Sequence, residues 1–167
     1  MDLMIRIYLE RAEDEIILAD AIKKLSEESE AKIFFHIEQK HTFYSATISH
    51  AYYSIFYAAK AILLTKSIKT EMPDVHKKTL TAFQEHFVDT GVLDVKLLAI
   101  YKKLVVRADE LLGIFKNEKK KRGNFTYSTI PQANKEPAED SVIHAKLFVA
   151  NIKKVVERET SSIADKC

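Results

Sequence analysis

The chain has 167 residues, 47% of them apolar and 30% charged, and a formal net charge of +2. This length favours a single domain with a substantial core, and the composition excludes a disordered chain or a generic polycation. Only three glycines and three prolines interrupt the chain, so the sequence favours a few long helices over a sheet of many strands.

The sequence has one cysteine, Cys167, so no internal disulfide can form, which suits a reducing compartment. Residues 1–14 carry charges throughout and lack the apolar core of a signal peptide. No segment approaches the run of about 18 apolar residues that a membrane span would need. We therefore expect a cytoplasmic protein with no membrane partner.

The first predicted helix covers residues 3–25, where apolar residues recur at steps of three and four. Residues 26–30 either end this helix or form a solvated turn of a longer one, because no breaker follows them. The second predicted helix covers residues 41–66, with Thr42 as its N-cap. Apolar side chains lie on nearly every side of it, which is typical of a central bundle helix or of one at a dimer interface.

A break follows this second helix. Pro73 disfavours helical backbone at the residue before it, and Asp74 is placed to cap a helix over residues 75–88. Gly91 is placed for a C-terminal cap of that helix.

Residues 94–118 form the clearest amphipathic run, and Pro137 is expected in the first turn of the last helix. We expect residues 161–167 to be a disordered tail. The sequence therefore predicts an all-α fold, an up-and-down bundle of about five helices, as one domain over residues 1–160.

Positive charge is concentrated at the junction between the last two predicted helices. Residues 116–122 hold five cations and one acid, whereas the rest of the chain holds 21 cations and 23 acids. A lysine run suits a helix C-terminus, so a solvated basic cap is one interpretation. The other is a nucleic-acid-binding site made by Lys119, Lys120, Lys121 and Arg122, because a guanidinium is suited to phosphate.

Polar and aromatic residues follow this cluster at once. Asn124, Phe125 and Tyr127 lie within five residues of Arg122. Phe125 either stacks on a base or packs into the core. A basic surface beside aromatic side chains fits single-stranded nucleic acid, and a core-facing aromatic pair fits the same letters.

A second candidate lies on the helix predicted over residues 41–66. Ser45, Ser49 and Tyr53 recur at steps of four and share one face, and His50 lies one step aside. These side chains either bond to the backbone and to neighbouring helices, or line a polar cleft.

The sequence predicts no metal site and no cofactor. Glu38 and His41 form one Glu-x-x-His pair, whereas a carboxylate-bridged di-iron bundle needs two such pairs and two further glutamates. A glycine-rich phosphate loop, a nucleophile elbow and a cysteine–histidine arrangement are all missing from the sequence.

Four stretches together resemble the HEPN family of prokaryotic helical domains. They are ISHAYYSIFYAAKAILLTK, HKKTLTAFQEHFVDTG, RGNFTY and PAEDSVIHAKLFVANIKK, and the resemblance covers roughly residues 43–154. The Ala-Tyr-Tyr-x-x-Phe-Tyr-Ala-Ala run is the most distinctive part. The spacing of Arg122 and Tyr127 agrees with the branch in which an arginine is followed by four residues and a tyrosine.

The resemblance implies a five-helix bundle, commonly a homodimer, and often a genetic pairing with a minimal nucleotidyltransferase. Ribonuclease members carry an arginine, four to six residues and a histidine, and two such motifs face one cleft in the dimer. They cut RNA without a metal, with the 2′-hydroxyl as internal nucleophile. Some members are toxins that a partner silences by adding adenylyl groups to a tyrosine near the motif.

Carried over to this sequence, Arg122 matches the family arginine, and Tyr127 stands where ribonuclease members have histidine. A phenol with a pKa of about 10 exchanges protons poorly near neutral pH, so the departure weakens general acid–base catalysis. Gly123 replaces the polar residue that often follows the arginine, and Asn124 is a partial substitute.

Three functions therefore stay open. The first is a module that binds RNA or a nucleotide, partnered by a minimal nucleotidyltransferase that modifies Tyr127 in a toxin–antitoxin-like pair. The second is a metal-independent endoribonuclease, with Arg122, Tyr127 and Asn124 as candidate catalytic residues. The third is a non-catalytic structural subunit.

Overall fold

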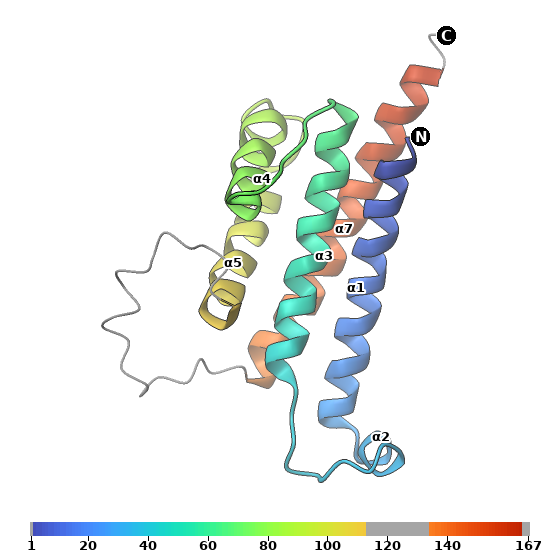
Figure 1. The fold of residues 1–167 in the computed structure, drawn as a ribbon, viewed down its shortest axis with the longest axis vertical. Coiled ribbons are helices and arrows are strands. Elements are labelled where there is room, and N and C mark those ends of the chain that lie inside the picture. Colours follow the sequence, from blue (N-terminus) through green and yellow to red (C-terminus); the bar gives the residue numbers. More distant parts are fainter. Residues whose placement is uncertain (1, 113–133, 165–167) are drawn as a thin grey trace, which may run out of the picture.

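A computed structural model describes residues 2–112 and 134–164 of the chain (Figure 1). Its elements are α1 (Leu3–Glu27), α2 (Ser29–Phe34), α3 (Tyr44–Thr65), α4 (Val75–Phe83), the π-helical turn η1 (Gln84–Val88), α5 (Val95–Leu112) and α7 (Lys135–Ala164). No strand occurs within these two ranges. The predicted all-α, up-and-down helical bundle is confirmed.

Helix α3 occupies the centre of the bundle (Figure 1). It packs against α1 and α7 on one side and against α4 and α5 on the other. Ile55, Ala58 and Ile62 are each 0% exposed, which explains why this helix is apolar on nearly every side. The structure thus supports the central position, one of the two interpretations that the sequence left open.

Aromatic side chains from α4, α5 and α7 pack together in the core. The ring of Phe83, at the end of α4, lies 5.6 Å from that of Tyr101 on α5 and 5.4 Å from that of Phe148 on α7. The rings of Tyr101 and Phe148 are 5.7 Å apart, and all three side chains are fully buried. Two of these contacts, Phe83–Tyr101 and Tyr101–Phe148, are edge-to-face and add to the large apolar area that each ring buries.

Ser26, near the end of α1, bonds to the segment that precedes α3. Ser26 Oγ donates to the carbonyl of Ile22 at 3.0 Å and accepts the amide of Phe43 at 2.8 Å. Glu28 then leaves helical geometry before α2 begins. The expected N-cap at Thr42 is wrong, because α3 begins at Tyr44 and Phe43 occupies the cap position without a side-chain bond.

The predicted helix over residues 75–88 is present as α4 and η1. Asp74 stands at its N-cap, but its side chain makes no capping bond and its backbone is left-handed, with φ of 58°. A capping side chain normally needs extended backbone at that residue, so the expected cap is not formed. Gly91, with φ of +75°, lies two residues beyond the C-cap Asp89, in the turn that ends this segment.

The last two helices agree with the sequence in position and differ in extent. α5 ends at Leu112 within the described residues, and the remainder of the run expected over residues 94–118 lies outside them. Pro137 falls in the first turn of α7, as expected. α7 continues to Ala164, so residues 161–164 of the expected tail are helical here. None of the described helices combines the length and apolarity of a bilayer-spanning segment.

Candidate functional site

The residues predicted at the basic junction lie outside the described residues. These are Lys119, Lys120, Lys121, Arg122, Asn124 and Tyr127. Their roles stay predictions. The structure does describe the two helices that flank the junction, α5 and α7.

An ion-paired cluster, which we call the Asp140 cluster, joins those two helix ends. Arg107, on α5, donates from Nη1 to Asp140 Oδ2 at 2.6 Å and to Ser141 Oγ at 3.0 Å, both on α7. Lys103 Nζ lies 2.8 Å from the same carboxylate oxygen, and His144 Nδ1 lies 3.2 Å from Asp140 Oδ1. Arg107 is five residues before the end of α5, and Asp140 is five residues after the start of α7. The cluster therefore ties α5 to α7 near the helix ends that flank the junction.

The charge state of Asp140 follows from this geometry. Burial alone would raise its pKa, but the hydrogen bonds from Lys103 and Arg107 outweigh that effect and lower the pKa to about 2. The carboxylate is thus ionised at neutral pH. With two cations against one anion, the cluster has one positive charge in excess when His144 is neutral.

The second predicted site lies on the outer face of α3. Ser45 is exposed, and Ser49 Oγ donates to the carbonyl of Ser45 at 2.9 Å. His50 Nδ1 lies 2.6 Å from Glu15 Oε2 on α1. Tyr53 is half-buried and lies among aromatic rings that the sequence analysis did not place with it.

Those rings form a continuous row across three elements, which we call the ring series. It runs from His76 on α4 to Tyr53 and Tyr57 on α3 and then to Tyr8 on α1. Successive ring centroids are 6.2, 6.4 and 6.1 Å apart. All four side chains are half-buried, so each ring is covered in part by protein and reaches the surface in part.

Two cations lie over the ring series. Arg11 Cζ is 5.6 Å from the centroid of the Tyr57 ring, and Lys60 Nζ is 4.9 Å from that of the Tyr8 ring. Both distances fall within the range of cation–π attraction. The row thus combines π-faces with positive charge, which is the combination that stacked bases and their phosphates require.

His76 is held in place by a buried tyrosine. Its Nδ1 lies 2.8 Å from the hydroxyl of Tyr52, and its ring centroid is 4.4 Å from that of Phe56. Burial, helped by the charge of Lys60, lowers the pKa of His76 below its ordinary value. Burial raises the pKa of Tyr53, with further contributions from Tyr57 and Glu15, so its phenol stays protonated at neutral pH.

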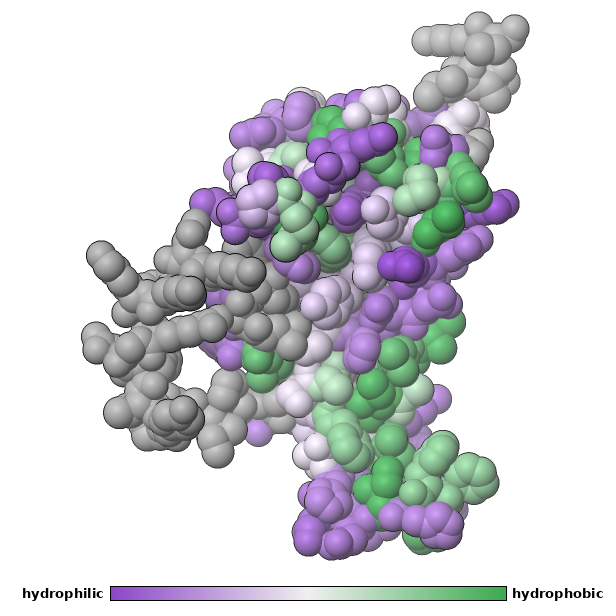
Figure 2. Space-filling model, viewed as in Figure 1, coloured by the Kyte–Doolittle hydropathy of each residue, from purple (hydrophilic) through white to green (hydrophobic). Residues whose placement is uncertain are grey.

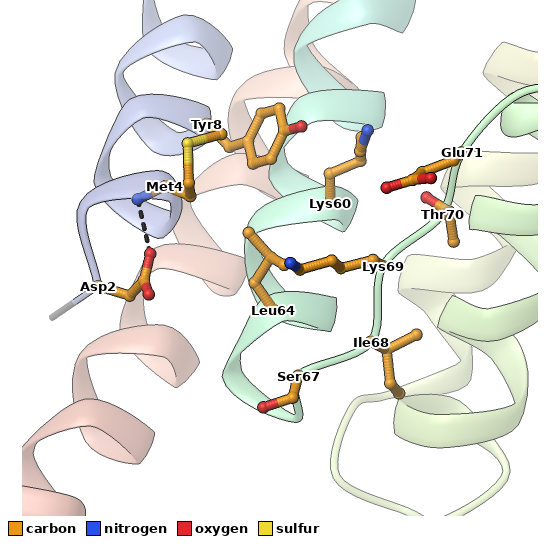
Figure 3. A pocket seen from close by; sticks show the side chains of 10 residues that line it. All are labelled: Asp2, Met4, Tyr8, Lys60, Leu64, Ser67, Ile68, Lys69, Thr70 and Glu71. Atoms are coloured by element: carbon orange, nitrogen blue, oxygen red, sulfur yellow. Dashed lines mark hydrogen bonds between the residues drawn. The ribbon is translucent and has the colours of Figure 1, made fainter.

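A surface pocket of about 350 Å³ opens at the Tyr8 end of the ring series (Figure 3). Tyr8 and Lys60 form one wall, and the segment that follows α3 supplies Lys69, Thr70 and Glu71. Figure 3 shows the carboxylate of Glu71 pointing toward Lys60. This volume lies at the lower end of the range of small-molecule sites in proteins.

Sequence reasoning named His50 and Tyr53 and missed Tyr8, Tyr57 and His76 as members of one surface. Part of the signal was present, because residues 50, 53, 57 and 60 recur at the steps of three and four that mark one helix face. The contribution of α1 and α4 had no local signal. Within residues 2–112 and 134–164, no three histidine, cysteine or acidic side chains are grouped as metal ligands would be.

The fold places this protein among all-α helical bundles, and no protein-family model matches the chain. A protein of Methanocaldococcus jannaschii named "Putative toxin MJ0605" is 30% identical over 139 residues, which are 82% of this chain and 87% of that protein. "Putative toxin MJ0142" of the same organism is 46% identical over 55 residues, 33% of this chain and 35% of that protein. A UPF0332 protein of Thermotoga maritima is 26% identical over 128 residues, 77% of this chain and 81% of that protein. The chain belongs to the family that includes Putative toxin MJ0605.

Proposed function

We propose that this protein is a HEPN-type module that binds RNA or a nucleotide and forms a toxin–antitoxin-like pair with a minimal nucleotidyltransferase. The observation that carries the toxin-like role is the match to Putative toxin MJ0605 over 82% of the chain. The Arg-x-x-x-x-Tyr spacing of Arg122 and Tyr127 supports the HEPN assignment.

The proposed phosphate contacts are Lys119, Lys120, Lys121 and Arg122. The Asp140 cluster supports a binding role, because it ties together the ends of α5 and α7 that flank this junction. A symmetric homodimer with facing junctions would deepen the positive potential further.

Salt dependence tests the binding role. Cations that neutralise phosphates release counterions, and each contact with a single strand contributes about −0.7 to the slope of log K against log salt. A Lys119/Lys120/Lys121→Ala variant should therefore lose about 2 from that slope for a labelled single-stranded RNA, measured by fluorescence anisotropy.

The matched control replaces three exposed cations elsewhere, Lys24, Lys154 and Arg158, with alanine. It therefore has the same net charge as the junction variant. It should retain a slope closer to that of the parent. Equal affinity and equal slope for the parent and the junction variant would overturn the binding role.

The partner is proposed to act on Tyr127. Its phenolic oxygen would receive an adenylyl group from ATP, with release of pyrophosphate and of the phenolic proton. Mass spectrometry after co-expression with a minimal nucleotidyltransferase tests this step. A mass increase that persists in Tyr127→Phe would show that another residue is the acceptor.

A metal-independent endoribonuclease is the second candidate, and the position of His144 favours it. This imidazole belongs to the Asp140 cluster and lies nine residues after the start of α7, the helix that follows the junction. It is a candidate to transfer the proton that Tyr127 transfers poorly. The 2′-hydroxyl would attack the adjacent phosphorus, the bond to the 5′-oxygen would break, and Arg122 would stabilise the charge on the phosphorane.

Incubation with total RNA in EDTA tests this second candidate. We expect fragments that end in a 2′,3′-cyclic phosphate, and loss of cleavage in both Arg122→Ala and His144→Ala. Cleavage by Arg122→Ala at the rate of the parent would exclude the ribonuclease function. The binding module and the non-catalytic structural subunit would then be the two remaining candidate functions.

A further inference from the structure

We propose that the ring series of Tyr8, Tyr57, Tyr53 and His76 binds the bases of single-stranded RNA by stacking, with residues other than those of the basic junction. The proposal rests on the proposed function for its choice of RNA. Its geometry uses only described residues and is independent of residues 113–133.

The orientation of α3 separates core rings from surface rings. Tyr52 and Phe56 are 0% and 6% exposed and face the interior, whereas the neighbouring Tyr53 and Tyr57 are half-buried and face outward. An outward position that only closed the contact with α1 would be served by aliphatic side chains. Tyrosine adds a π-face and a hydroxyl, which an aliphatic side chain lacks and which a stacking platform for a base uses.

The spacing of the rings fits splayed bases. Neighbouring centroids are 6.1 to 6.4 Å apart along the row. This is roughly twice the ~3.4 Å rise of a stacked strand. A strand on this surface would therefore be unstacked, with a base on each ring. Proteins that recognise single-stranded RNA commonly bind it in this form.

Charge along the row fits the RNA backbone. Arg11 and Lys60 lie over Tyr57 and Tyr8, close enough to contact the phosphates between stacked bases. Acidic side chains also border the row: Glu15 lies 2.6 Å from His50 Nδ1, and Asp2 and Glu71 line the pocket at the Tyr8 end. In Figure 2, pale and purple residues occupy much of the middle of the view, and green residues gather at its lower end and at its upper right.

Two further features extend the row at its ends. The bond from Tyr52 fixes the ring of His76, so the last platform is oriented before any ligand arrives. At the other end, the pocket beside Tyr8 is large enough for a base. Its lining combines two cations, Lys60 and Lys69, with two carboxylates, Asp2 and Glu71, and the carboxylates can accept hydrogen bonds from the exocyclic amino groups of a base.

Substitution of single rings tests the proposal. The probe is a fluorescein-labelled, unstructured 12-nucleotide RNA, titrated by anisotropy against Tyr57→Leu and Tyr8→Leu of the full chain. Leucine keeps apolar volume and removes the π-face, so each variant should bind about tenfold more weakly. Tyr44→Leu is the matched control, because Tyr44 is also half-buried on α3 and lies outside the ring series. Circular dichroism and thermal melting confirm that each variant is folded.

An abasic probe separates stacking from charge. A 12-nucleotide chain with riboses and phosphates but no bases should bind the parent and Tyr57→Leu equally.

The outcomes distinguish the two proposals. Weak binding in the ring variants with normal binding in Lys119/Lys120/Lys121→Ala supports the ring series and overturns the junction. Normal binding in Tyr57→Leu and Tyr8→Leu, with loss in the junction variant, overturns the ring series alone. No binding of RNA by the parent overturns both, and tighter binding of single-stranded DNA of the same sequence overturns the choice of RNA.

Discussion

Replacement of Asp140 by asparagine removes one charge from the Asp140 cluster while keeping the size of the side chain. Lys103, Arg107 and His144 would then face an amide in place of a carboxylate. The pKa of about 2, against an ordinary value of 3.8, corresponds to about 2.4 kcal/mol at ~1.36 kcal/mol per pH unit. Because the side chain is 33% exposed, solvent screening reduces the expected loss to about 1–2 kcal/mol.

Urea denaturation at pH 7 measures this loss, and the midpoint of thermal unfolding should fall by roughly 2–8 °C. The pH dependence has a definite sign. A carboxyl whose pKa is lower in the folded state contributes stability above its unfolded pKa, and the contribution is lost as pH falls through the folded pKa. The difference between parent and Asp140→Asn should therefore shrink from about pH 4 downward, reach roughly half its full size at pH 3 and nearly vanish at pH 2.

Glu139→Gln is the matched control. This neighbouring carboxylate is 51% exposed and lies 3.9 Å from Lys23, so its loss should cost under about 0.5 kcal/mol. A difference between parent and Asp140→Asn that is as large at pH 2.5 as at pH 7 would refute the electrostatic argument. A difference no larger than that of the control would show that the cluster does not stabilise the fold.

Three further predictions concern the packing of the bundle and its ring series. Ser26→Ala should destabilise the fold by about 1–2 kcal/mol in urea denaturation, because the amide of Phe43 loses its acceptor. Phe148→Ala should cost about 3–5 kcal/mol by the same measurement, because its ring is fully buried among other aromatic side chains. Tyr52→Phe should cost about 1 kcal/mol and change the nuclear magnetic resonance signals of the His76 imidazole, because its bond to Nδ1 is lost.

A control variant and two contradicting outcomes accompany these predictions. Ser161→Ala should leave stability within about 0.5 kcal/mol, since its exposed hydroxyl only bonds back to the carbonyl of Glu157. A loss as small for Ser26→Ala would mean that this side chain does not hold α1 to the start of α3. Unchanged imidazole signals in Tyr52→Phe would mean that the tyrosine does not orient His76.

The helices were predictable because their signals are local. Apolar residues at steps of three and four placed α1, α3, α5 and α7, and Pro73 and Gly91 marked the limits of the segment formed by α4 and η1. The cap at Thr42 was predicted from residue type alone and was wrong. Residue type does not tell that the amide of Phe43 is already bonded to a side chain of α1.

The candidate sites also differ in whether local sequence or tertiary packing defines them. The cations from Lys119 to Arg122 stand together in the sequence, so a local reading finds them. Arg107 and Asp140 are 33 residues apart, and only the packing of α5 against α7 makes them a pair. The ion pair that ties α5 to α7 is therefore a property of the fold.

By itself, the sequence determined an all-α chain, the places of its long helices and the concentration of positive charge at one junction, because periodicity and composition act over a few residues. The tertiary structure decided where α1 ends, which face of α3 reaches the surface, and that rings from α1, α3 and α4 form one row. Contacts between residues distant in the chain set these features, since each depends on how whole helices pack.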